Sequence, residues 1–283
     1  FTKLSLKNMD IHYNILLGVC TVVGIRNKTG YWRHKMQYYI PTKVYQEIDA
    51  VKVHAEELSG YGSCALIVTG KYSARANGAL ADVEAALNVY GKKHVQYDEI
   101  EENPSVETVM KATEFGKRNG VDYVIAIGGG SPMDAAKAIA IMLANPEENA
   151  DYLYESVAHT KALPVVTIPT TCGTGSEVTG VAVLTVHAKR TKASLPHRVF
   201  PVLALADPKY LKTASRKVIG QTAIDALGHM IESYLNRTAT DYSRMFVAQG
   251  LKVWARSKDA LLGMREMTDE DYSNFLLAST LAG

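Results

Sequence analysis

The chain has 283 residues, of which 47% are hydrophobic and 21% charged, so it can bury a substantial core as one large domain or two modest ones. Its 31 basic and 29 acidic residues leave a formal net charge of +2, which gives no electrostatic reason to expect a nucleic-acid or membrane partner. The three cysteines are widely spaced without a CxxC pattern, which indicates neither a disulfide framework nor a structural zinc site. We therefore expect a cytoplasmic protein with a small-molecule partner.

The first 35 residues differ from the rest of the chain because they show no sustained period of 2 or 3.6. We treat residues 1–35 as an atypical extension, with a natural start at Met36. Its most apolar stretch, Ile15 to Ile25, is interrupted by two glycines and is shorter than the roughly 20 residues that cross a bilayer. No membrane-spanning helix and no secretion signal are expected.

Between residues 36 and 206, short apolar runs alternate with segments of helical spacing. A first strand is predicted over Tyr38–Val44 and a first helix over Tyr45–Leu58. The further predicted strands are 64–70, 95–97, 123–127, 164–169, 181–186 and 202–206, and the further helices are 77–90 and 105–119. This rhythm predicts an α/β domain with a parallel sheet, in which ligands bind at the carboxyl ends of the strands.

A run of three glycines and a serine joins the predicted strand 123–127 to an alanine-rich helix. Glycine lets the backbone approach a pyrophosphate, and the N–H groups at a helix start favour negative charge. A tight turn without a ligand is the alternative, since the segment is not the GxGxxG fingerprint. The candidate cofactor-binding residues here are Gly128, Gly129, Gly130, Ser131 and Asp134.

A second loop, residues 168–177, concentrates hydroxyls and glycines after another apolar run. Its hydroxyls are suited to binding the adenosine or phosphate oxygens of a nucleotide, so Thr170, Thr171 and Thr174 are candidate cofactor-binding residues. Ser176 is not assigned as a nucleophile, because the loop has no GxSxG elbow and no neighbouring histidine base.

The chain beyond Asp207 is predicted to be helical, with helices over Ala214–Leu235, Tyr242–Arg256 and Asp269–Leu281. In the first of these, Asp225 and His229 are four residues apart and project from one face, where a carboxylate and an imidazole can bind a divalent metal. An ordinary surface pair or a satisfied histidine is the alternative interpretation.

Three segments together, GGGSPMDAAK, IPTTCGTGSE and AIDALGHMIESY, resemble the motifs of the iron-containing (group III) alcohol dehydrogenases over about residues 36 to 283. The resemblance implies an NAD(P)-dependent enzyme that interconverts a primary alcohol and its aldehyde, and a homo-oligomer. It implies that the first two motifs bind the dinucleotide, and that Asp225 and His229 are two of four ligands of Fe²⁺, with Zn²⁺ as the alternative metal. Lys192 lies where relatives place a cofactor-contacting lysine. The implied domains are a nucleotide-binding domain, 36–206, and a helical metal and substrate domain, 207–283.

Two departures from the family qualify this expectation, and one is the extension of residues 1–35, which matches nothing in the family. The family's other two metal-ligating histidines, and a histidine near the nicotinamide, lie downstream of a segment resembling Leu276–Gly283. We therefore expect a truncated, impaired form and assign no catalytic residue, treating His159, His187 and His197 as surface or loop residues. The alternatives are a catalytically silent nucleotide-binding or assembly-forming fragment, and a zinc-dependent enzyme resembling glycerol dehydrogenase.

The end of the predicted strand 64–70 bears on the choice of cofactor. NAD-preferring relatives tend to carry an acidic residue there, whereas this chain has Gly70 followed by Lys71, Ser73 and Arg75. Losing the acid and gaining cations would accommodate a 2′-phosphate, so NADP is expected over NAD. In the alternative interpretation, the basic residues are ordinary solvated surface.

Overall fold

The computed structural model describes residues 4–6, 9–16, 19–23 and 38–283, and divides the chain into two compact units, Phe1–Gln37 and Tyr38–Gly283. The first unit holds an antiparallel sheet of β1 (Leu4–Leu6), β2 (Met9–Leu16) and β3 (Val19–Val23). The sequence pattern had not predicted these strands. The expected start at Met36 lies outside the described residues.

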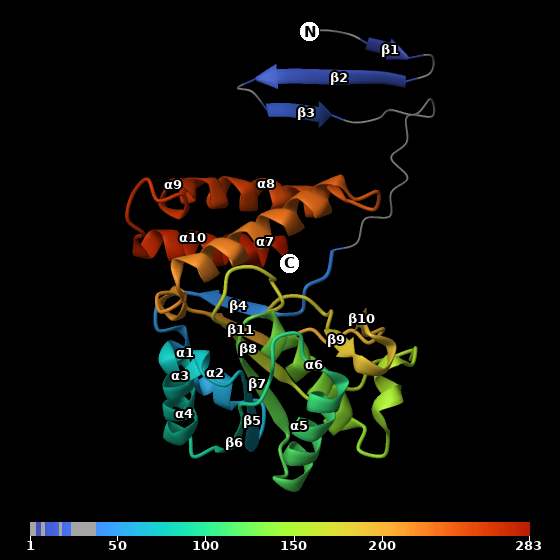
Figure 1. The fold of residues 1–283 in the computed structure, drawn as a ribbon, viewed down its shortest axis with the longest axis vertical. Coiled ribbons are helices and arrows are strands. Elements are labelled where there is room, and N and C mark those ends of the chain that lie inside the picture. The colour runs from blue at the N-terminus through green and yellow to red at the C-terminus, as the bar shows by residue number, and fades with distance from the viewer. Residues whose placement is uncertain (1–3, 7–8, 17–18, 24–37) are drawn as a thin grey trace. The chain divides into compact units, whose positions relative to one another are not determined.

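The second unit is built on a parallel sheet of six strands in the order β4-β11-β8-β7-β5-β6 (Figure 1). The bounds are β4 (Lys43–Gln46), β5 (Cys64–Thr69), β6 (Lys93–Tyr97), β7 (Tyr123–Gly128), β8 (Val165–Pro169) and β11 (Leu203–Ala206). Strands β5, β7, β8 and β11 are buried along their whole length, as continuous apolar runs require.

Helices cover both faces of this sheet (Figure 1). On one face lie α1 (Ala50–Val53), α2 (Ala55–Ser59), α3 (Ser73–Ala76) and α4 (Ala79–Val89), and on the other α5 (Val106–Arg118) and α6 (Gly130–Ala144). Alternate residues of each strand enter opposite cores: Leu66 and Val124 pack with α5 and α6, whereas Ile67 and Ile125 pack with the helices of the other face. The predicted α/β class is confirmed.

The chain after β11 is helical, as predicted. It forms η3 (Pro208–Leu211), α7 (Arg216–Leu235), α8 (Asp241–Arg256), α9 (Lys258–Leu261) and α10 (Asp269–Ala282). Ser215, Thr240 and Thr268 cap the three long helices with their side-chain oxygens. A third core cluster joins Ile219 and Ala223 of α7 to Phe275 of α10 and Cys172 of the hydroxyl-rich loop. These helices are therefore anchored to the edge of the sheet that carries that loop.

Two short additions complete the unit. The strands β9 (Val183–Val186) and β10 (Thr191–Ser194) form an antiparallel pair outside the main sheet, linked by η2 (His187–Lys189). The 3₁₀ helix η1 (Ala150–Tyr154) precedes β8. Among the described residues, no helix is both long and apolar enough to cross a membrane.

The start of the second unit differs from the prediction. The predicted helix over Tyr45–Leu58 is wrong at its beginning, because Tyr45 and Gln46 belong to β4 and pair with Leu205 and Ala206 of β11. Helical structure begins only at Ala50, after Asp49 takes a left-handed φ of 60°. Pairing with a strand far along the chain overrode the local helical spacing.

Candidate functional site

The three glycines form the junction between β7 and α6. Gly128 ends the strand with a φ of +153°, a conformation that side chains rarely adopt, and a Cβ atom there would lie 2.5 Å from Cγ of Pro132. Gly129 is the N-cap of α6 and Gly130 its first residue. The turn therefore places the start of a 15-residue helix directly at the carboxyl end of a central strand.

The hydroxyl-rich loop lies against this turn. The backbone N–H of Thr170 donates to the carbonyl oxygen of Gly128 at 2.9 Å. A Cβ atom on Gly129 would lie 2.8 Å from Oγ1 of Thr171, and one on Gly130 would lie 2.9 Å from Cγ2 of Thr174. The two loops thus face one another, and glycine is what allows their close approach.

A cleft of about 170 Å³ opens at this edge of the sheet. Its walls are Asn103, Pro104, Gly130, Ser131, Asp134, Thr174, Val183, Thr185 and Lys192. Five of the predicted site residues, Gly130, Ser131, Asp134, Thr174 and Lys192, thus meet in one place. The other five do not line this cleft: Gly128, Gly129, Thr170 and Thr171 belong to the two loops behind it, and Gly70 directly follows the neighbouring strand β5.

Asn103 is a cleft residue that sequence reasoning missed. It has a left-handed φ of 58°, its backbone N–H donates to Oγ of Ser131 at 3.1 Å, and its Oδ1 accepts from Nζ of Lys192 at 2.7 Å. The signal was available, since an Asn-Pro dipeptide follows the strand β6 directly before a predicted helix. Asn103 holds the lysine from β10 beside the first turn of α6.

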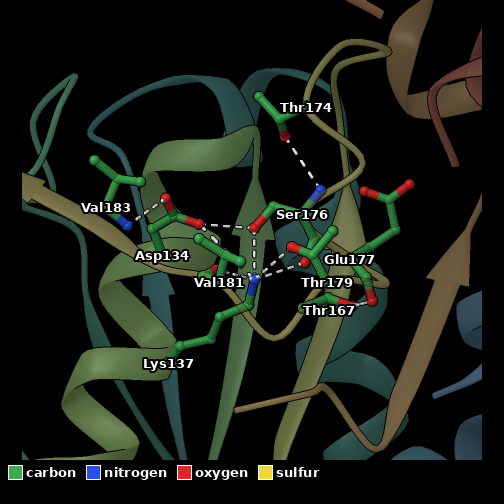
Figure 2. A network of polar contacts seen from close by, with 9 residues as sticks. All are labelled: Asp134, Lys137, Thr167, Thr174, Ser176, Glu177, Thr179, Val181 and Val183. Carbon is green, nitrogen blue, oxygen red and sulfur yellow. Dashed lines mark hydrogen bonds and ion pairs between the residues drawn. The ribbon is translucent and has the colours of Figure 1, made fainter. Parts of the chain in front are cut away.

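Behind the cleft, Lys137 of α6 is fully buried and lies at the centre of a polar network (Figure 2). Its ammonium donates to the carbonyl oxygens of Ser176 and Val181, both at 2.8 Å, and to Oγ of Ser176 at 2.7 Å. Ser176 in turn donates to Oδ1 of Asp134 at 2.7 Å, and Oδ2 of Asp134 accepts from the backbone N–H of Val183 at 3.0 Å. The network joins α6, the hydroxyl-rich loop and β9.

Burial sets the ionisation of this network. Loss of hydration lowers the pKa of Lys137 to about 8, although the carboxylates of Asp134 and Glu177 favour its charged form. Burial also raises the pKa of Asp134, opposed by Lys137 and by the hydrogen bonds from Ser176 and Val183. The ammonium has three protons for the three oxygens within 2.8 Å, with Oγ1 of Thr179 farther away at 3.4 Å, so the site suits its charged form.

Glu177, at the end of the hydroxyl-rich loop, is a buried acid. Figure 2 shows its carboxylate turned away from the Lys137 ammonium. Oε1 accepts a hydrogen bond from Oγ1 of Thr280 in α10 at 2.7 Å, and burial raises the pKa of the acid. This contact is a direct polar link between the hydroxyl-rich loop and α10.

Replacing this acid with its amide is expected to stabilise the protein at alkaline pH. Because the folded state raises the pKa of Glu177, stability falls as the pH rises from about 4.5 through the raised pKa. Glu177→Gln keeps an oxygen for Thr280 and removes this loss, so the melting temperature at pH 8 should rise by about 2 °C or more and the gain should shrink at pH 5. Calorimetry checks this, with exposed Glu148→Gln as the control. A gain that is equal at both pH values would contradict the account.

The predicted metal pair lies on α7 beside the same loop. Oδ2 of Asp225 is 3.6 Å from Nε2 of His229, both side chains are half exposed, and a Cβ atom on Gly173 would lie 3.0 Å from Oδ2 of Asp225. Among the described residues, no group of three or more His, Cys, Asp or Glu side chains is placed to hold a metal. His197, expected to be a surface or loop residue, lies in the loop between β10 and β11 but is buried there, with Nε2 2.9 Å from the carbonyl oxygen of Tyr152.

At the end of β5, Gly70 has room for a side chain, because the nearest atom to a Cβ there is the carbonyl oxygen of Ile100 at 3.4 Å. The guanidinium of Arg75 donates to Oε1 of Gln96 at 2.5 Å and lies 3.6 Å from Oδ2 of Asp98. The Asp98 carboxylate and the Arg75 guanidinium are both about half exposed. The basic group therefore has a fixed place close to the carboxyl ends of β5 and β6.

Comparison with known proteins is consistent with this arrangement. The sequence profile of the family described as iron-containing alcohol dehydrogenase matches residues 41–208. The chain is 36% identical over 220 residues to the long-chain primary alcohol dehydrogenase AdhA of Thermoanaerobacter ethanolicus, which covers 77% of this chain and 55% of the relative. It is 32% identical over 247 residues to the NADH-dependent butanol dehydrogenase A of Clostridium acetobutylicum, which covers 87% of this chain and 63% of the relative.

Solved structures agree with the sequence matches. An iron-containing alcohol dehydrogenase from Thermotoga maritima superposes with a TM-score of 0.81 at 37% identity, over 87% of this chain and 67% of that one. The fold is an α/β domain on a six-stranded parallel sheet, followed by a helical carboxyl-terminal region. The chain belongs to the iron-containing alcohol dehydrogenase family, and it spans about 55 to 63% of the length of the two relatives named above.

Proposed function

We propose that this protein is an NADP-preferring, iron-dependent oxidoreductase that interconverts a primary alcohol and its aldehyde. The observation that carries the proposal is that the candidate nucleotide cleft and the candidate metal pair of α7 lie at the same edge of the sheet. The glycine turn and hydroxyl-rich loop form the cleft, and Asp225 lies against Gly173 of that same loop. A nucleotide in the cleft and a metal on α7 would thus be held by opposite sides of one loop.

The cleft fits the diphosphate part of a nucleotide. The start of α6 and the ammonium of Lys192 supply positive charge, and Gly130 leaves its backbone uncovered on the cleft wall. Ser131 and Thr174 add hydroxyl groups. At about 170 Å³, the cleft suits one part of a dinucleotide rather than the whole molecule, so the sugars and rings would extend along the sheet edge.

Asp225 and His229 fit Fe²⁺ in the chemistry of their donors, since a carboxylate oxygen and an imidazole nitrogen on one helical face both suit that ion. When bound, the metal would supply polarisation of the alcohol or aldehyde oxygen, and the nicotinamide would carry the hydride. The chain's own contribution is positional: the loop orients the nucleotide on one side and α7 presents two metal donors on the other.

An assay of alcohol-dependent NADP⁺ reduction, combined with fluorescence titration of NADPH, tests the proposal. Failure to bind either reduced nucleotide would overturn it. Binding without turnover, with or without added Fe²⁺, would instead support the alternative of a catalytically silent nucleotide-binding or assembly-forming fragment. Activity with Zn²⁺ but not Fe²⁺ would favour the alternative that resembles glycerol dehydrogenase.

NADPH is expected to bind more tightly than NADH, because Gly70 offers no carboxylate to the ribose and Arg75 lies nearby. Since a side chain fits at Gly70, Gly70→Asp should fold normally, weaken NADPH binding about tenfold by repelling the 2′-phosphate, and spare or improve NADH binding. Titration of both reduced nucleotides decides this. Equal or tighter binding of NADH by the unaltered protein would show that Lys71 and Arg75 are ordinary surface residues.

We further propose that the protein forms a homo-oligomer. Three large apolar side chains, Ile224, Ile231 and Leu235, are 53%, 47% and 73% exposed on one side of α7. Their spacing of seven and eleven residues places them in a single stripe, which is the kind of surface that association covers.

A further inference from the structure

The cleft contains a charge that conflicts with the proposed ligand. Asp134 lines its wall, and a carboxylate there would repel the pyrophosphate of a nucleotide. Neither oxygen of this carboxylate is without a partner, because Oδ1 accepts from Ser176 and Oδ2 from the backbone N–H of Val183. The Lys137 ammonium lies 3.8 Å from Oδ1 on the side away from solvent.

Lys137 also fixes the geometry of the walls. It holds the carbonyl oxygens of Ser176 and Val181, which belong to the hydroxyl-rich loop and to the segment leading into β9 (Figure 2). The backbone N–H of Ser176 donates to Oγ1 of Thr174, which is itself a cleft residue. One buried cation thus connects three walls of the cleft without facing the ligand.

From this arrangement we propose that Lys137 is a positioning residue for the nucleotide, which neutralises Asp134 from behind and holds the hydroxyl-rich loop and β9 at the spacing the diphosphate requires. The inference rests on the proposed function. It assigns Asp134 a supporting role through Ser176 and Val183 in place of the direct cofactor contact expected from the sequence.

Lys137→Met removes the charge and keeps most of the side-chain volume. NADPH affinity at pH 7 is expected to fall about tenfold, because the partly buried Asp134 carboxylate in the cleft wall loses the ammonium behind it. Adding Asp134→Asn to the same chain removes that charge, and the new amide can donate to Ser176 while its oxygen accepts from Val183. The double variant is therefore expected to recover to within about threefold of the unaltered affinity.

The pH profile gives a second readout. The charged groups that act on the Lys137 ammonium are Asp134 from α6, at 3.8 Å, and Glu177 from the loop, whose carboxylate is turned away from it. NADPH affinity of the unaltered protein should fall as the pH rises through about 8, where the ammonium loses its proton, and the Lys137→Met profile should be flatter.

Lys209→Met is the matched control. This lysine also joins several groups, with its ammonium 2.5 Å from Asp49, 2.9 Å from Asp82 and 3.5 Å from Asp207, but none of these lines the cleft. It should lower the melting temperature and leave NADPH affinity unchanged.

Fluorescence titration of NADPH with the whole chain distinguishes the outcomes. If the unaltered protein binds no NADPH, the proposed function itself is wrong. If it binds and Lys137→Met binds equally well, the function stands and the inference fails. If Lys137→Met weakens NADPH binding and adding Asp134→Asn does not restore it, the proposed charge compensation is wrong. If Lys137→Met does not fold, Ser176→Ala, which breaks the link to Asp134, decides in its place: weaker binding supports the inference and unchanged binding overturns it.

Discussion

Gly128→Ala is expected to destabilise the protein by about 3 kcal/mol and to weaken NADPH binding more than tenfold. The alanine would have to adopt a φ of +153°, and its Cβ would lie 2.5 Å from the Pro132 ring, so backbone strain and overpacking act together. Relief requires the turn to move, and the start of α6 would move with it. Thermal unfolding should show a melting temperature lower by roughly 6 to 12 °C.

Gly220→Ala provides the control for this substitution. Gly220 lies inside α7, where the nearest atom to a new Cβ is Cδ1 of Leu261 at an ordinary 3.9 Å. Alanine there should raise stability by about 0.5 to 1 kcal/mol and leave NADPH binding unchanged. If Gly128→Ala matched this control in both measurements, the turn would not have the tight geometry described.

The polypeptide of residues 1–283 is expected to retain well below one Fe²⁺ per chain after gel filtration, and to turn over alcohols slowly. Asp225 and His229 offer two donors, whereas transition-metal sites that hold their ion firmly have three or more protein ligands. Metal analysis and anaerobic equilibrium dialysis measure the retention. His229→Ala should lower the remaining Fe²⁺ affinity by about tenfold or more.

His187→Ala, in the linker between β9 and β10, is the control and should leave Fe²⁺ binding unchanged. A polypeptide that kept one tightly held iron per chain and showed full alcohol-dependent NADP⁺ reduction would contradict the prediction. The ligands would then include residues beyond Asp225 and His229, or the assignment of the third motif would be wrong.

The sequence predicted those parts of the fold whose signal is local. Cys64–Thr69 and Tyr123–Gly128 are uninterrupted apolar runs, and the three long carboxyl-terminal helices have both a cap and a regular period. Tyr45 and Gln46 of β4 were predicted as helix, because their strand character comes from pairing with Leu205 and Ala206, which no local window contains. The strands of the first unit lack a sustained alternation, so a period of two could not reveal them.

The candidate site was predicted where backbone geometry alone dictates residue type. Glycines at 128–130 predicted the tight turn at a helix start from the sequence alone, whereas the close approach of Thr171 and Thr174 is seen only in the structure. The Asn-Pro dipeptide marks a turn at Asn103, but its place in the cleft and the role of Lys137 could not be found from the sequence. Their importance depends on contacts with Lys192, Ser176 and Val181, which are 39 to 89 residues away along the chain.

The edge strand β4 has a consequence for the order of assembly on the ribosome. Its partner β11 is synthesised about 160 residues later, which at 5 to 20 residues per second is a delay of roughly 8 to 32 s. Strands β5, β6 and β7 can pair during that interval, since they follow one another closely in sequence and lie side by side. The segment Lys43–Gln46 must stay available until β8 and β11 have joined the sheet, so the last strand to dock onto the six-stranded sheet is the first of its six strands to be made.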